Sequence, residues 1–107
     1  MITILSFYKL KKIKKLKSIK KILFKEINLL SIKGLIILSP EGINGTLSGS
    51  QKNTSVIKKS ILSCFKISKF DVLNITHSKF VPFLKAKIKI KSEVVPINEK
   101  YDFNKKI

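Results

Sequence analysis

The spacing of hydrophobic side chains in the first third of the chain predicts a strand followed by a helix. Residues 2–8 are rich in β-branched and aromatic side chains, which is typical of a short strand. Between residues 13 and 30, apolar positions recur at steps of three and four, and lysines fill most positions between them. This period predicts an amphipathic helix that packs one face on a sheet. Its apolar stripe consists of Leu16, Ile19, Leu23, Ile27 and Leu30.

The next segment predicts a buried strand and a hairpin. Lys33 and Gly34 mark the expected end of the first helix, with Gly34 in a left-handed cap position. Residues 35–39 form an apolar run before a proline, which favours a central buried strand. A glycine-rich turn follows, in which Asn44-Gly45 is typical of hairpins, and residues 45–48 begin the antiparallel partner strand.

The second half of the chain predicts one more helix and two more strands. Ser50 is positioned to cap the helix. The apolar stripe of this helix comprises Ile57, Ile61, Cys64 and Phe65. Residues 72–76 predict a strand, and residues 85–91 alternate strictly between lysine and apolar side chains, as a half-buried strand does.

The expected order of elements is therefore β-α-β-β-α-β-β. This order is a split βαβ arrangement in which two helices cover one face of a mostly antiparallel sheet. It predicts an α+β sandwich of the ferredoxin-like or acylphosphatase-like kind. We expect this domain to occupy residues 1–97, and residues 98–107 to form a loose tail or the start of a linker.

The charge of the chain indicates its partners only in part. It has 23 lysines, no arginine and six acidic residues, for a formal net charge of +17. Lysine attracts phosphate as a point charge and lacks the bidentate fork of arginine, so nucleic-acid contacts should be backbone-directed and salt-sensitive. The 18 isoleucines and the absence of arginine also indicate A/T-rich coding. The charge alone leaves both origins open.

The residue inventory predicts no catalytic, metal or cofactor site. The single cysteine, Cys64, excludes an internal disulfide, and the single histidine, His77, excludes a multi-histidine metal cluster. Cys64 is expected to act as a small hydrophobic side chain, and no paired carboxylates or nucleophile-base pair can be assembled. The sequence has no apolar stretch long enough for a transmembrane helix and no signal-peptide pattern, so we expect a cytoplasmic protein without membrane partners.

Residues 40–50 contain three of the four glycines in the sequence Pro-Glu-Gly-Ile-Asn-Gly-Thr-Leu-Ser-Gly-Ser. The backbone N–H groups of residues 42–45 fit two interpretations, an anion-binding concavity or a tight hairpin, and spacing alone favours the hairpin. This motif and residues 33–38 before it resemble the N-terminal domain of the rhodanese-containing tRNA uridine-34 hydroxylases. Phe7-Tyr8-Lys9, Pro82-Phe83 and the lysine-alternating strand before Glu93-Val94-Val95 are similar to the same family.

The resemblance implies the acylphosphatase-like fold, tRNA as a partner, and oxygen-dependent hydroxylation of uridine 34 by the family's rhodanese domain. Alternate lysines on the last strand would form a basic row about 20 Å long, which suits either a phosphodiester backbone or the protection of a sheet edge. The candidate RNA-binding residues are Lys9, Gly42, Asn44, Gly45, Lys85, Lys87 and Lys89.

The resemblance covers only the first domain of that family. The rhodanese domain and its catalytic cysteine have no counterpart in these 107 residues, so we expect the isolated chain to be inactive. It is then a truncated form, a split gene product, or a half that pairs with a separate rhodanese-like chain. Two alternatives remain: a protein-interaction or structural domain whose charge reflects coding bias, and, less favoured because arginine is absent, an acylphosphatase-type hydrolase.

Overall fold

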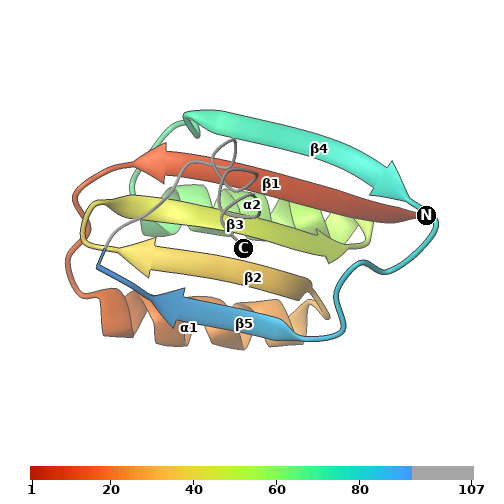
Figure 1. Cartoon of the computed structure of the whole chain (residues 1–107), viewed down its shortest axis with the longest axis horizontal. Helices are drawn as coiled ribbons and strands as arrows, with labels where there is room; N and C mark the ends of the chain where they lie inside the picture. Colours follow the sequence, from red (N-terminus) through yellow and green to blue (C-terminus); the bar gives the residue numbers. More distant parts are fainter. Residues whose placement is uncertain (93–107) are drawn as a thin grey trace, which may run out of the picture.

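A computed structural model describes residues 1–92, which form one five-stranded sheet with two helices behind it (Figure 1). The elements are β1 (Ile2–Leu10), α1 (Leu16–Leu29), β2 (Lys33–Ser39), β3 (Gly42–Gly49), α2 (Gln51–Cys64), β4 (Val72–Ser78) and β5 (Ala86–Ile90). The strand order is β4-β1-β3-β2-β5, antiparallel except for the parallel β2–β5 pair. The predicted α+β sandwich and its element order are confirmed. The expected boundary at residue 97, the expected tail and Glu93-Val94-Val95 lie outside the described residues.

The core lies between the helices and one face of the sheet. Leu23 and Ile27 of α1 are fully buried, as are Ile57 and Ile61 of α2, so both predicted helical stripes pack as expected. They meet alternate side chains from the three central strands. These side chains are Leu5, Phe7, Ile36, Leu38, Ile43 and Leu47. Burial of each large apolar side chain contributes about 1.5–3 kcal/mol, which makes this interface the main source of stability.

A side chain caps the start of α2, and backbone hydrogen bonds cap the end of α1. The Ser50 side chain accepts a hydrogen bond from the backbone N–H of Asn53 at 3.1 Å, which confirms the predicted N-cap of α2. At the end of α1, Ser31 adopts the left-handed conformation with φ 54°, and the Ile32 N–H donates to the Ile27 carbonyl at 3.0 Å. This is a Schellman arrangement. The predicted cap at Gly34 is therefore wrong, because the helix ends earlier and Gly34 lies inside β2.

The hairpin between β2 and β3 turns at Pro40 and Glu41, not at Asn44-Gly45 as predicted. Proline fixes its own φ and lacks an N–H, so Pro40 interrupts the ladder before the glycines are reached. The Ser39 hydroxyl accepts a hydrogen bond from the Glu41 N–H at 3.1 Å and supports the turn. Asn44 and Gly45 instead lie within β3, the central strand, which pairs with β1 on one side and β2 on the other.

Neither helix within residues 1–92 combines the length and apolarity needed to span a bilayer.

Candidate nucleic-acid interface

The lysines of β5 form an exposed row at one edge of the sheet. Lys87 lies beside Leu35 and Lys89 beside Ile37 on the face that the helices leave open, while Ile88 between them is buried on the helix side. Lys85 and Lys91 flank the strand and are also exposed. Alternate residues on a strand repeat about every 6.6 Å. We name Lys85, Lys87, Lys89 and Lys91 the β5 row.

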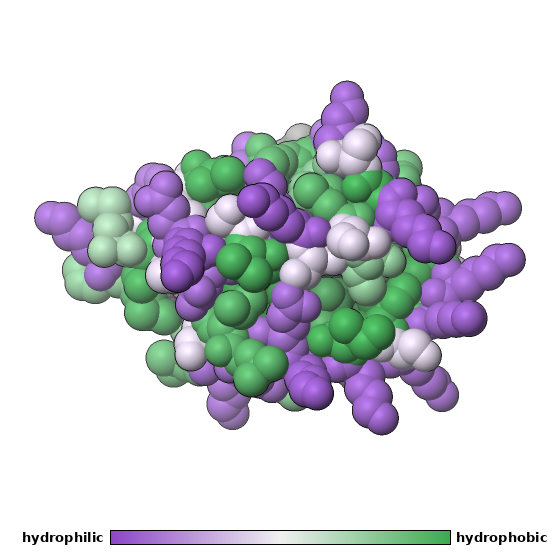
Figure 2. All heavy atoms as spheres, turned by 180° about the vertical axis from the view of Figure 1, so that it is seen from behind, coloured by the Kyte–Doolittle hydropathy of each residue, from purple (hydrophilic) through white to green (hydrophobic). Residues whose placement is uncertain are grey.

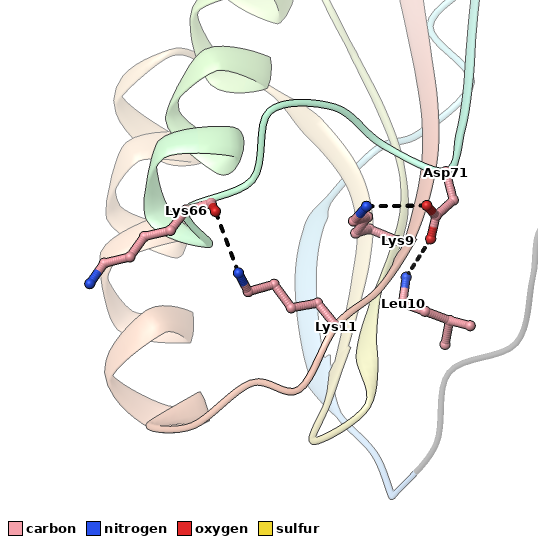
Figure 3. Close-up of polar contacts among 5 residues, drawn as sticks. All are labelled: Lys9, Leu10, Lys11, Lys66 and Asp71. Carbon is pink, nitrogen blue, oxygen red and sulfur yellow. Dashed lines mark hydrogen bonds and ion pairs between the residues drawn. The ribbon is translucent and has the colours of Figure 1, made fainter.

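Lys9 does not join the β5 row. Two strands separate β1 from β5, a distance of about 14 Å across the sheet. Alternation along β1 also places Lys9 on the same side as Phe7, which is the helix side, and its Nζ lies 3.2 Å from the Asp71 carboxylate (Figure 3). Lys9 and the β5 row therefore do not form one continuous basic face.

Asp71 connects the end of β1 to the start of β4. Its Oδ2 accepts a hydrogen bond from the Leu10 N–H at 2.8 Å, and its Oδ1 accepts one from Lys9 (Figure 3). The Leu10 hydrogen bond, followed by the hydrogen bond and charge of Lys9 and the charge of Lys69, holds the pKa of Asp71 below its ordinary value. Lys9 thus forms an ion pair that links β1 to the start of β4.

Replacing Asp71 with asparagine should lower stability at neutral pH and have less effect in acid. Because the folded-state pKa of Asp71 is lowered, its stabilising contribution is present above the unfolded-state pKa and is lost as pH falls through the folded-state value. Urea unfolding midpoints of wild type and Asp71→Asn, taken at neutral and at acidic pH, measure the difference in stability between the two proteins. This difference should also become smaller in high salt. If the difference in stability did not change with pH, the ionised Asp71 carboxylate would not be the stabilising group.

A second basic region lies in the connection between β1 and α1. Residues 11–15 read Lys-Lys-Ile-Lys-Lys, and all four lysines are exposed while Ile13 is buried. The Ile13 N–H donates to the Pro40 carbonyl and the Lys11 N–H to the Glu41 carbonyl, each at 2.9 Å, so the loop is fixed against the β2–β3 turn. We name residues 11–15 the basic loop. The sequence prediction missed it, because it began the helix at residue 13, within this loop, whereas α1 begins at Leu16.

The basic loop borders the start of α1 and the end of α2. A groove of about 490 Å³ lies there, and Lys66 and Cys64 contribute to its wall. The first turn of α1 contains no acidic residue, and its N-cap, Lys15, makes no side-chain capping bond. The partial positive charge of the helix N-terminus therefore adds to that of the lysines.

The predicted glycine-motif residues lie in the middle of the sheet. Gly42, Asn44 and Gly45 are buried, and β3 pairs with a neighbouring strand on each side. A Cβ at Gly45 would lie 2.5 Å from Cζ of Phe7, so this glycine makes room for a core ring. This arrangement favours the hairpin and packing interpretation of the motif over an anion-binding concavity.

Cys64 and His77 show no activated geometry. Burial, and then the negative charge of Glu26, raises the pKa of the half-buried Cys64 thiol, which keeps it protonated at neutral pH. His77 is exposed on β4, with Nδ1 3.2 Å from the Thr3 hydroxyl. Within residues 1–92, no three His, Cys, Asp or Glu side chains gather closely enough to hold a metal ion.

Comparison with known families identifies the chain. Residues 2–94 match the family described as the UPF0176 acylphosphatase like domain. The chain belongs to this family. This chain is also 41% identical over 97 residues to the tRNA uridine(34) hydroxylase of Pelagibacter ubique (strain HTCC1062). The aligned segment covers 91% of this chain and 32% of that protein. It is 34% identical over 67 residues to the protein of the same name from Rickettsia canadensis (strain McKiel), covering 63% of this chain and 26% of the relative. The chain thus spans about a third or less of the length of these curated relatives, and the predicted family resemblance is confirmed.

Solved structures confirm the fold of the UPF0176 domain. The acylphosphatase from Bacillus subtilis superposes with a TM-score of 0.58 at 9% identity, over 85% of this chain and 100% of that one. Full-length HypF superposes with a TM-score of 0.61 at 15% identity, over 90% of this chain and 13% of that one. At these identities the likeness concerns the fold alone.

Proposed function

We propose that this chain is the N-terminal, tRNA-docking domain of an oxygen-dependent tRNA uridine-34 hydroxylase. The observation that carries the proposal is the 41% identity to the Pelagibacter hydroxylase over 91% of the chain. The aligned segment is 32% of that relative, so we assign the chemistry to a rhodanese-like part outside this segment, in the same protein or in a separate chain.

The two basic regions support this role because they meet at one end of the sheet. The Lys91 N–H donates to the Leu38 carbonyl at 2.8 Å, and the Ile13 N–H donates to the Pro40 carbonyl two residues further on. The β5 row and the basic loop therefore adjoin at the end of β2 (Figure 1). Together they present eight lysines on a rigid scaffold. A phosphate backbone tracking this surface would displace counterions from each contact, which makes binding strongly salt-dependent.

We expect the chain to bind tRNA at low salt and to lose affinity steeply as KCl rises. Three variants of equal charge, each with four Lys→Gln changes, locate the surface. One changes the β5 row, one the basic loop, and the control changes helix lysines. The control positions are Lys20, Lys21, Lys25 and Lys59. Fluorescence anisotropy with labelled tRNA should show weaker binding and a shallower salt slope for the first two variants and a much smaller change for the control. No tRNA binding at low salt would refute the proposal.

The alternative is a protein-interaction or structural domain whose charge reflects coding bias. Figure 2 shows hydrophilic side chains over the helix side of the molecule as well, and the exposed lysines of α1 include Lys17, Lys20, Lys21 and Lys25. A charge spread over several surfaces is what coding bias would produce. Equal loss of affinity in all three Lys→Gln variants would favour this alternative, because binding would then follow total charge and not a surface.

A further inference from the structure

The two edge strands of the described sheet are protected to very different degrees. β5 carries Lys87 and Lys89, and lysine on an edge strand is a common defence against unwanted strand pairing. β4 forms the opposite edge (Figure 1), and its sequence, Val-Leu-Asn-Ile-Thr-His-Ser, contains no lysine, acidic residue or proline.

The side chains of β4 extend the apolar face of the sheet beyond the helices. Leu73 lies opposite Phe7 and Ile75 opposite Leu5, so both point to the core side. They are nevertheless 38% and 51% exposed, because no helix within residues 1–92 covers them fully. The side chains of an added strand would cover part of both.

A pocket lies directly beside this edge, between β4 and α2. Its volume is about 200 Å³, and its apolar wall includes Leu5 and Ile75. Its polar wall includes Lys58, His77 and Ser55, and among residues 1–92 no acidic side chain lines it. A pocket with this lining fits a carboxylate at the end of a short side chain.

We propose that the outer edge of β4 binds an extended segment of an acidic protein partner as an additional strand, with one Glu or Asp side chain in the pocket beside Lys58. In this mode of recognition, backbone hydrogen bonds supply affinity and a pocket for alternate side chains supplies specificity. A row of backbone N–H and C=O groups matches another polypeptide backbone and has no counterpart in nucleic acid. The proposal is independent of the tRNA-docking role.

Charge determines which polypeptide fits. A second copy of the chain would bring another net charge of +17 to the edge, and the two copies would repel each other. An acidic segment is attracted by the same field, and its carboxylate would find Lys58 in the pocket. We therefore assign the edge to an acidic partner and treat self-pairing as a contrary outcome.

The test uses a capped synthetic peptide of alternating glutamate and valine, as long as β4, added to the ¹⁵N-labelled chain. NMR should show shifted and exchange-protected amides in β4 and around the pocket, and small changes in β5. A lysine-valine peptide, which the positive chain repels, should fail to bind at the edge. A glutamate-proline peptide should also fail, because every second residue lacks a backbone N–H and has a fixed φ.

Two matched substitutions separate edge pairing from general charge attraction. Ile75→Lys on β4 should weaken peptide binding about tenfold or more, although it adds a charge that attracts the peptide. Ile90→Lys makes the same change on the other edge, where Ile90 is 38% exposed, and should bind the peptide as wild type does or slightly better. Lys58→Gln should weaken binding by up to about fivefold while the shifts in β4 persist.

Three results would overturn the proposal. These are peptide shifts centred on the β5 row, equal binding by Ile75→Lys and wild type, and sedimentation of the chain alone as a dimer that Ile75→Lys dissociates. Thr76→Lys, at an exposed position on the other side of β4, repeats the test should Ile75→Lys fold poorly. Affinity for tRNA should be unchanged in Ile75→Lys, so failure of this proposal and failure of the tRNA proposal can be told apart.

Discussion

Replacing Gly34 with alanine is expected to remove about 3–5 kcal/mol from the free energy of unfolding. Gly34 lies in β2 with φ +132°, a conformation that side chains with a Cβ rarely adopt. A Cβ there would overlap the carbonyl oxygen of Thr46 and lie 2.9 Å from Cα of Leu47. Both atoms belong to the backbone of the central strand β3, which is paired on both sides and cannot give way. Domains of this kind are stable by about 5–15 kcal/mol, so the variant should be marginal.

Urea unfolding followed by circular dichroism measures this loss, and Gly49→Ala is the control. Gly49 has no positive φ, and the nearest atom to an added Cβ would be Ile32 Cγ1 at 3.2 Å, which belongs to a side chain. Gly49→Ala should therefore remain within about 1 kcal/mol of wild type. If the two variants lost similar free energies of unfolding, neither the conformation of Gly34 nor its backbone contacts would explain the need for glycine at this position.

Periodicity predicted the elements of this fold because the burial of a helix or strand face is recorded locally in the sequence. The steps of the apolar stripe placed Leu23 and Ile27 against the sheet, and the alternation of residues 85–91 placed Ile88 inside and Lys87 outside. Ser50 acts within one helical turn, so its cap was also predictable.

The errors share a different cause, since each depends on a contact between segments distant in sequence. Gly34 resembles a helix cap locally, but its requirement for glycine comes from Thr46 on the neighbouring strand. Asn44-Gly45 resembles a turn, but pairing with Tyr8 and Phe7 on one side and with β2 on the other makes it a central strand. The ion pair of Lys9 with Asp71 is likewise a contact between distant segments that the sequence alone does not show.

The candidate site was only partly predictable for the same reason. The alternating lysines of β5 were visible in the sequence. The basic loop lies next to these lysines because the Lys91 N–H donates to the end of β2 and the Ile13 N–H donates to the turn beyond it. These contacts between distant segments were not visible in the sequence. The glycine motif indicated the family correctly, but a family resemblance carries no information about which atoms touch a ligand.

Gly45→Ala is expected to destabilise the domain by about 2–3 kcal/mol, while the folded protein keeps its affinity for tRNA. An added Cβ would lie 2.5 Å from Cζ and 3.0 Å from Cε1 of Phe7. The Phe7 ring is fully buried and its centroid lies 5.0 Å from that of Phe70, so it has little room to move. The cost should therefore arise from Phe7 and not from any ligand contact.

A double-mutant cycle with Phe7→Leu tests this cause directly. Leucine lacks the outer ring atoms that the new Cβ would meet, so Gly45→Ala should cost at least about 1 kcal/mol less in the Phe7→Leu background than in wild type. Additive losses would mean that Phe7 is not the reason for glycine at this position. If folded Gly45→Ala protein lost tRNA affinity, the motif would contact RNA after all, because the β5 row and the basic loop are unchanged in this variant. If the variant kept its tRNA affinity but lost stability, the glycine motif would serve to shape the sheet. Docking would then depend on the lysines of the β5 row and the basic loop.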